Sequence, residues 1–215
     1  LLDFAAACRR GLDELLAAQR FAAVVVQGDT ESAFLGALAG FYRQLPVAHV
    51  EAGLRTHELA RPFPEEGLRQ MIARIARFHF APTERAVAAL RAEDIPAERI
   101  VRTGNTVVDA QHWVAERYQV RRRQSGRGHL LVTLHRREHW GDELAQLCHA
   151  IAEVARRHPE LAVRFPVHLN PLVQAPVRQI LGGLPNVQLG APLGYVEMQQ
   201  ALADAWLVLT DSGGL

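Results

Sequence analysis

The sequence predicts an α/β fold built from two doubly wound parallel sheets. Short apolar runs of strand length alternate with longer stretches in which apolar residues recur at helical spacing, which is the pattern of strand–helix–strand units. A polar stretch rich in Arg, Gly and Ser, residues 119–128, interrupts this alternation, which then restarts. We therefore expect two domains, residues 1–120 and 121–215, each with its own sheet.

The first domain is expected to begin with a helix over residues 1–19. Its apolar side chains fall on one face, as in a helix that covers a sheet. Turns that contain Gly28 and Gly104 follow two of the strands, and the last helix would serve as a hinge to the second domain. Strands are expected at residues 22–26, 47–50, 78–81 and 100–102, and further helices at 32–42, 66–77, 83–93 and 107–118.

The second domain repeats the alternation. The sequence lacks an initiator Met and stops at Leu215, inside what the pattern predicts to be a strand-to-helix turn. We therefore expect a fragment at both ends, so that each domain is incomplete. Strands are expected at residues 130–133, 161–167, 187–189 and 206–209, and helices at 143–157, 173–181 and 195–203.

Composition excludes several functional classes. The net charge is +1. All 24 basic residues are Arg and none is Lys, so neither a P-loop NTPase nor a lysine Schiff-base enzyme is expected, because both need a lysine. Without a basic block beyond residues 121–123 we expect no nucleic-acid or membrane-surface partner. Cys8 and Cys148 are isolated and the histidines lack metal-ligand spacing, so we expect no disulfide, no metal and a cytoplasmic location. No apolar run reaches the roughly 18 residues that would cross a bilayer.

Polar residues gather where the predicted strands end. In an open parallel sheet, ligands bind at the carboxyl ends of the strands. The loop after the second strand, residues 49–66, is the most crowded of these positions because it combines acidic, basic and hinge residues. The strand-end groups are Asp29, Glu51 with Glu65, His135 with Arg136 and Arg137, His168, and Ser212 with two glycines.

Three of these groups differ in the chemistry that they suggest. His135 and the two arginines after it suit a diphosphate clamp, although a surface basic run at a helix start is equally compatible. The glycines after Ser212 would let a backbone approach an anion at a helix N-terminus. His168, which precedes Asn170, fits a structural histidine better than a ligand.

The strand-end motifs together resemble the non-hydrolysing UDP-N-acetylglucosamine 2-epimerases. The resemblance implies two Rossmann-like domains arranged as in the GT-B glycosyltransferases, a cytoplasmic homodimer and no cofactor. It also implies interconversion of UDP-GlcNAc with UDP-ManNAc for bacterial surface polysaccharide synthesis. The motifs are Val26-Gln27-Gly28-Asp29-Thr30, His49-Val50-Glu51-Ala52-Gly53-Leu54-Arg55-Thr56, Pro64-Glu65-Glu66 with Arg69, Thr103-Gly104-Asn105-Thr106, His135-Arg136-Arg137-Glu138, Pro166-Val167-His168-Leu169-Asn170-Pro171 and Thr210-Asp211-Ser212-Gly213-Gly214.

The resemblance also implies roles for individual residues. Catalytic roles fall on Asp29, Glu51, Glu65 and His135, and substrate-binding roles on Arg69, Arg136, His168, Leu193, Met198, Ser212, Gly213 and Gly214. Leu68 departs from the family, which usually carries Asn there. Family segments that bind substrate fall outside the chain at both ends, so this segment alone is expected to be inactive.

Other classes remain open at the sequence level. A GT-B glycosyltransferase would use the same nucleotide-binding domain, but transfer chemistry does not require Glu51 together with Glu65. A hydrolysing 2-epimerase would release free ManNAc and typically differs in the segment 51–56. A catalytically inactive nucleotide-sugar sensor would bind UDP-GlcNAc and leave its C2 hydrogen in place.

Overall fold

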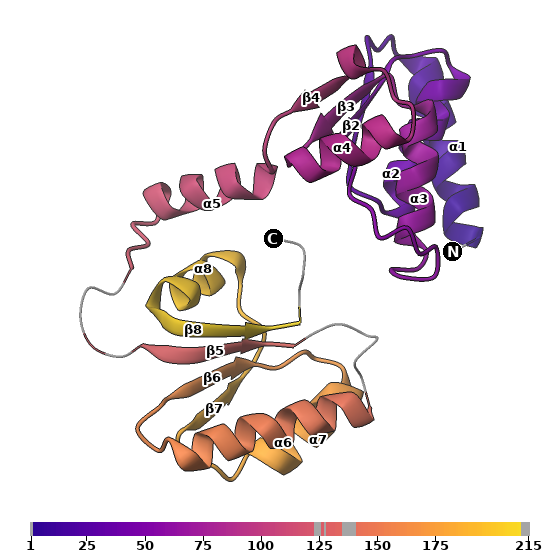
Figure 1. Cartoon of the computed structure of the whole chain (residues 1–215). Coiled ribbons are helices and arrows are strands. Elements are labelled where there is room, and N and C mark those ends of the chain that lie inside the picture. The colour runs from indigo at the N-terminus through magenta and orange to yellow at the C-terminus, as the bar shows by residue number, and fades with distance from the viewer. Residues whose placement is uncertain (1, 123–125, 127, 135–140, 212–215) are drawn as a thin grey trace. The chain divides into compact units, whose positions relative to one another are not determined.

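The computed structural model describes residues 2–122, 126, 128–134 and 141–211. The chain forms two compact units, Leu1–Asp109 (unit 1) and Ala110–Leu215 (unit 2). Each contains its own four-stranded parallel sheet (Figure 1), so the predicted fold class is confirmed. The division between the units falls within helix α5 (Thr106–Arg117). The domain boundary expected after residue 120 stays a prediction, and the two divisions differ in the unit that receives most of α5.

Unit 1 has the strand order β1-β2-β3-β4, and every neighbouring pair is parallel. Its predicted strands and helices are confirmed to within two residues at each end, and a short 3-10 helix, Ala97–Arg99, was not predicted. The elements before α5 are α1 (Leu2–Ala18), β1 (Val24–Gln27), α2 (Glu31–Tyr42), β2 (Val47–Val50), α3 (Glu65–Ile75), β3 (Phe78–Ala81), α4 (Glu84–Ala92) and β4 (Ile100–Arg102).

Local sequence explains where two of these helices begin. The side chains of Thr30 and Thr83 accept hydrogen bonds from backbone N–H groups three residues later, which caps α2 and α4. The core between α2, α3 and the sheet includes Val26, Val47 and Ile72. Helices α2 and α4 therefore start shortly after β1 and β3 end, whereas a long loop, residues 51–64, separates β2 from α3. This loop and the turn after β1 lie at the carboxyl ends of β1 and β2.

Helix α1 differs from its prediction as a helix that covers the sheet. It packs on α2 and lies outside it (Figure 1), and none of its residues is buried. Phe4 and Leu15 are 51% and 46% exposed. The physical reason is that α2 already packs on β1 and β2, so α1 forms an outer layer.

Unit 2 has the strand order β7-β6-β5-β8. Helices α6 and α7 lie on one side of its sheet and α8 on the other (Figure 1). A single core surrounds Leu130, Val163 and the fully buried Phe165. The elements, which also agree with the predictions to within two residues, are β5 (His129–Thr133), α6 (Asp142–Arg157), β6 (Val163–Pro166), α7 (Pro171–Leu181), β7 (Val187–Gly190), α8 (Tyr195–Asp204) and β8 (Ala205–Thr210).

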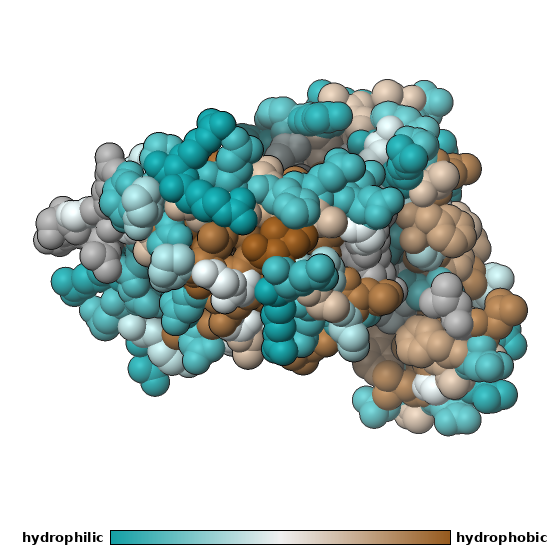
Figure 2. Space-filling view, turned by 90° about the horizontal axis from the view of Figure 1, so that it is seen from below, coloured by the Kyte–Doolittle hydropathy of each residue, from teal (hydrophilic) through white to brown (hydrophobic). Residues whose placement is uncertain are grey.

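Parts of the surface are apolar. On the face that Figure 2 shows, hydrophobic areas interrupt a mostly hydrophilic surface. In unit 2, Trp206 and Leu207 of the edge strand β8 are 61% and 56% exposed. Among the residues that the structure describes, no helix combines the length and apolar character needed to cross a membrane.

Candidate active site

Asp29 is held by an arginine from a neighbouring helix. It follows β1 immediately after Gly28, whose φ of 73° gives the tight turn. Arg69, on α3, donates from Nη2 to Asp29 Oδ2. Its Nη1 lies 3.5 Å from Glu66 Oε2. The Asp29 side chain is 28% exposed and that of Arg69 12%, so the ion pair is screened little by solvent and still leaves the carboxylate accessible.

Glu51 lies next to the Asp29 turn. A Cβ atom placed on Gly28 would be 3.6 Å from Glu51 Oε2. The residues that precede this turn and Glu51, Gln27 and Val50, pair directly across β1 and β2. The strand register therefore brings two carboxylates to one edge of the sheet, as the sequence predicts from strand ends.

The backbone of Glu51 is in the left-handed region, with a φ of 67°. This conformation is unfavourable for a residue with a Cβ and occurs often at functional sites. Its Oε1 accepts a long hydrogen bond of 3.5 Å from Asn105 Nδ2, which belongs to the loop after β4. Asn105 is a site residue that the role assignments missed, although its Gly-Asn-Thr motif was the available signal.

Glu65 and Glu66 open α3 and differ in environment. Glu65 is half-buried, whereas Glu66 is fully buried. Burial raises the pKa of Glu66, but hydrogen bonds from Gln70 and from the backbone N–H groups of Thr56 and His57 outweigh it and bring the pKa below its ordinary value. The role of Glu66 is therefore to anchor the loop, a role that sequence reasoning missed.

The loop after β2 is fastened at a second point. Arg55 is 1% exposed and binds both oxygens of Glu93, at the end of α4, through Nε at 2.6 Å and Nη2 at 2.9 Å. The hydrogen bond from Arg55 lowers the pKa of Glu93, and burial opposes it. Gly53 makes the approach possible, since a Cβ there would lie 2.3 Å from the Ala86 carbonyl oxygen.

Two buried histidines lie beneath this loop. His49 on β2 and His79 on β3 pair in register and are 1% and 0% exposed. His49 Nε2 is 2.8 Å from the Gly28 carbonyl oxygen, which can only accept, so Nε2 carries the hydrogen. Burial lowers the pKa of His49 and lowers that of His79 to about 4. Both rings are therefore neutral at pH 7, and neither had been assigned a role from the sequence.

Three of the seven predicted substrate-binding residues of unit 2 lie in the part of the chain that the structure describes. His168 follows β6, is exposed, and its Nδ1 accepts from the Asn170 N–H at 3.1 Å. Leu193 lines a cavity of about 240 Å³ at the carboxyl ends of β6 and β7. Met198 is half-buried on α8. The other predicted residues of this unit, His135, Arg136, Ser212, Gly213 and Gly214, lie outside the described residues.

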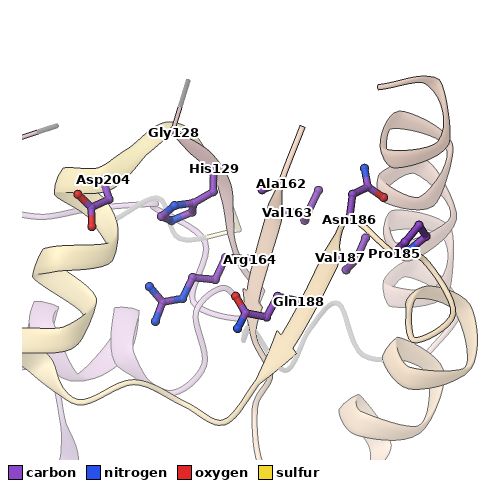
Figure 3. Close-up of a pocket in the computed structure, with 10 residues that line it drawn as sticks. All are labelled: Gly128, His129, Ala162, Val163, Arg164, Pro185, Asn186, Val187, Gln188 and Asp204. Atoms are coloured by element: carbon purple, nitrogen blue, oxygen red, sulfur yellow. The ribbon is translucent and has the colours of Figure 1, made fainter. Parts of the chain in front are cut away.

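Unit 2 also contains a larger cavity, of about 600 Å³, which no predicted site residue lines. It lies where β5, β6 and β7 begin, which is the opposite edge of the sheet from the one that binds ligands in such folds. Figure 3 shows Arg164 and Gln188 on neighbouring strands and Asp204 at the end of α8. We assign this cavity no role.

The family resemblance places Arg69 near the active-site carboxylates, where it could also hold Glu65, but its ion pairs are with Asp29 and Glu66. Helical spacing allows both partners, because Glu65 and Glu66 lie four and three residues before Arg69. Glu66 is the fully buried one of the two, and it lies on the side of α3 where the mostly buried Arg69 side chain packs. Within the described part of the chain, no group of three or more His, Cys, Asp or Glu side chains could hold a metal ion.

Comparison with known proteins identifies the family. The family model for UDP-N-acetylglucosamine 2-epimerase matches residues 3–215. The UDP-N-acetylglucosamine 2-epimerase of Yersinia pestis is 43% identical over 97% of this chain, and that of Escherichia coli K12 is 42% identical over 97%. The chain spans 59% of the length of each of these relatives.

Solved structures agree with this match. The crystal structure of UDP-GlcNAc 2-epimerase from Neisseria meningitidis bound to UDP-GlcNAc has a TM-score of 0.91 and 34% identity, over 99% of this chain and 60% of that one. The Methanocaldococcus jannaschii enzyme in complex with UDP-GlcNAc and UDP has a TM-score of 0.77 and 29% identity, over 98% and 60%. The chain therefore belongs to the UDP-N-acetylglucosamine 2-epimerase family.

Proposed function

We propose that the full-length protein interconverts UDP-GlcNAc and UDP-ManNAc without net hydrolysis. The observation that carries the proposal is that Asp29 and Glu51 follow directly paired strand ends at the carboxyl edge of one sheet, in a chain of this family. Two relatives of known structure were solved with UDP-GlcNAc bound. Glycosyl transfer alone would give no reason for this cluster of carboxylates.

The reaction needs both leaving-group expulsion and proton transfer. The C2 hydrogen has no adjacent carbonyl, so direct deprotonation is too costly. When the C1–oxygen bond breaks, its electron pair leaves with UDP and positive charge develops at C1. A carboxylate then takes the C2 proton, and the C2–H electron pair forms the double bond of 2-acetamidoglucal. Protonation of C2 on the other face and return of the phosphate oxygen to C1 give the epimer.

The acid and base roles fall on Asp29, Glu51 and Glu65. A positioned proton-transfer group contributes about 10² to 10⁴-fold. The contact with Arg69 orients the Asp29 carboxylate, and Glu51 accepts a hydrogen bond from Asn105. In this proposal His135 and Glu65 complete the catalytic group.

The second domain would bind the nucleotide. Stabilising the departing diphosphate is an electrostatic task for cations and backbone amides. By family resemblance we assign it to Arg136 and the backbone of Ser212, Gly213 and Gly214, with His168, Leu193 and Met198 towards the nucleotide. No cofactor takes part in the scheme.

The wider context of the protein is also part of the proposal. We infer from the same resemblance a cytoplasmic homodimer that supplies ManNAc to surface polysaccharide synthesis and that has no nucleic-acid or membrane partner. Analytical ultracentrifugation of the full-length protein tests the dimer. A monomer at micromolar concentration would contradict it.

Product analysis tests the proposed reaction. Full-length protein is incubated with UDP-GlcNAc, and the mixture is followed by proton NMR. We expect UDP-ManNAc to appear until a constant ratio is reached, and the same ratio when the reaction starts from UDP-ManNAc. Accumulation of free ManNAc and UDP would indicate a hydrolysing epimerase. Consumption of UDP-GlcNAc only in the presence of a sugar acceptor would indicate a glycosyltransferase.

A further inference from the structure

Glu66 is a fully buried acid that lies beside the proposed catalytic carboxylates. Burying an ionised carboxylate is unfavourable unless hydrogen bonds replace its water. Here three donors do so: the Thr56 N–H reaches Oε2 at 3.1 Å, and the His57 N–H and Gln70 Nε2 reach Oε1 at 3.1 and 2.8 Å. Glu66 therefore stays charged inside the fold, and two of its bonds hold the backbone of the loop that carries Glu51.

The same carboxylate also orients Arg69. Glu66 Oε2 is 3.5 Å from Arg69 Nη1, and the other terminal nitrogen, Nη2, donates to Asp29. A guanidinium is planar and rigid, so fixing one end of its fork fixes the other. The position of Asp29 is thus coupled, through Arg69 and Glu66, to the backbone at Thr56 and His57.

We propose that Glu66 is a positioning residue of the active site. It holds the guanidinium of Arg69, and Arg69 in turn orients the Asp29 carboxylate. Glu66 is too buried to touch a substrate, so its effect would pass through Arg69. The inference rests on the proposed function, because it assumes that Asp29 takes part in proton transfer. A misplacement of about 1 Å in a reacting group can cost about 10²-fold in rate.

The test is the Glu66→Gln variant of the full-length protein, with Glu93→Gln as its matched control. The amide introduced by Glu66→Gln would present an NH₂ group to one of the loop N–H donors and would remove the charge beside Arg69. Glu93 fastens the same loop from the other side, through Arg55, whereas Arg69 pairs with Asp29 and Glu66. Both substitutions weaken the contacts that hold the loop. Only Glu66→Gln also disturbs the orientation of the Asp29 carboxylate.

We expect Glu66→Gln to lower kcat by about tenfold or more, with KM and UDP affinity within about twofold of wild type. Glu93→Gln should keep kcat within about threefold of wild type at a similar loss of thermal stability. Equal losses of kcat in the two variants, or wild-type kcat in Glu66→Gln, would overturn the inference.

A second variant decides the matter if Glu66→Gln does not fold. Arg69→Lys replaces the guanidinium with a single ammonium group, which cannot span Asp29 and Glu66 as the fork does. Arg69→Lys should therefore lower kcat, and wild-type kcat in this variant would overturn the inference. If the wild-type protein forms no UDP-ManNAc, the proposed function fails and this inference fails with it. Normal wild-type turnover with unimpaired variants contradicts the inference alone.

Discussion

Arg55 and Glu93 form a bidentate ion pair, in which Arg55 Nε lies 2.6 Å from Glu93 Oε1 and Arg55 Nη2 lies 2.9 Å from Glu93 Oε2. The Arg55 side chain is 1% exposed. Glu93 lies at the end of α4, so the pair fastens the loop after β2 to a different element from the one that Glu66 uses. The loop after β2 is therefore fastened on two sides, by Glu93 through Arg55 and by Glu66 through the backbone of Thr56 and His57.

Breaking the ion pair between Arg55 and Glu93 should lower the free energy of unfolding. Arg55→Met leaves the Glu93 carboxylate poorly solvated, and removal of one partner from a buried pair costs about 3 to 5 kcal/mol. Urea unfolding of wild type and variant measures the change in the free energy of unfolding. Arg43→Met breaks an exposed pair with Asp13, whose side chains are 37% and 70% exposed, and should cost at most about 1 kcal/mol. Similar losses in the two variants would refute the claim that burial makes the Arg55 pair important.

Glu51 should separate stability from activity. In Glu51→Gly the left-handed φ of 67° becomes favourable, so we expect a gain of about 1 kcal/mol in the free energy of unfolding, with complete loss of turnover. Glu51→Gln keeps the strain and the shape and removes a carboxylate that transfers protons in the proposed reaction, so turnover should be abolished while UDP binding survives. Calorimetric titration with UDP distinguishes the outcomes: a Gln variant that no longer binds UDP would mean that Glu51 is structural.

His79 should make the fold sensitive to acid. Its pKa is lowered to about 4 by burial, whereas in the unfolded chain it lies near 6.5. Below about pH 6.5 His79 is protonated in the unfolded state and remains neutral in the folded state. The free energy of unfolding therefore falls as the pH drops towards 4. The loss is about 1.4 kcal/mol per pH unit, or about 3 kcal/mol over the window.

His79→Phe removes this proton and keeps an aromatic ring of similar size. Urea unfolding at several pH values between about 7 and 4.5 should show a shallower loss of stability in the variant than in wild type. The pKa of the neighbouring His49 is also lowered by burial, so part of the pH dependence should persist. Identical pH slopes in the two proteins would show that His79 does not titrate as its burial implies.

Gly53 should tolerate no side chain. Its φ is +89°, and a Cβ would lie 2.3 Å from the Ala86 carbonyl oxygen, so Gly53→Ala must push the loop away from α4 and should cost about 3 kcal/mol or more. Gly11 in α1 provides the control, because nothing lies within 4 Å of a Cβ there. Gly11→Ala should gain about 0.5 to 1 kcal/mol from helix propensity. A thermal shift of the same sign in both variants would count against the contact with Ala86.

The sequence predicts the elements of this fold well because their signals are local. Thr30 and Thr83 cap helices, and apolar runs such as 47–50 mark buried strands. The alternation of strands and helices then places Asp29 and Glu51 at one sheet edge, and the register confirms that placement.

Contacts between distant residues were less predictable. The choice of Arg69 between Glu65 and Glu66 depends on which helical face is buried. The pairing of His49 with His79 depends on the register between β2 and β3. The exposure of α1 depends on α2, which lies between α1 and the sheet. A periodic pattern identifies the apolar face of a helix, but it does not say which of two neighbouring helices packs directly on the sheet.

Deuterium incorporation at C2 is the most direct test of the carboxylate mechanism. The wild-type full-length protein and its Glu51→Gln variant are incubated with UDP-GlcNAc in D₂O, and the C2 position of the nucleotide sugar is followed by proton NMR and mass spectrometry. The account predicts that wild type replaces the C2 hydrogen with deuterium as UDP-ManNAc forms and that the variant leaves it in place. Formation of UDP-ManNAc with the original hydrogen retained at C2 would contradict it.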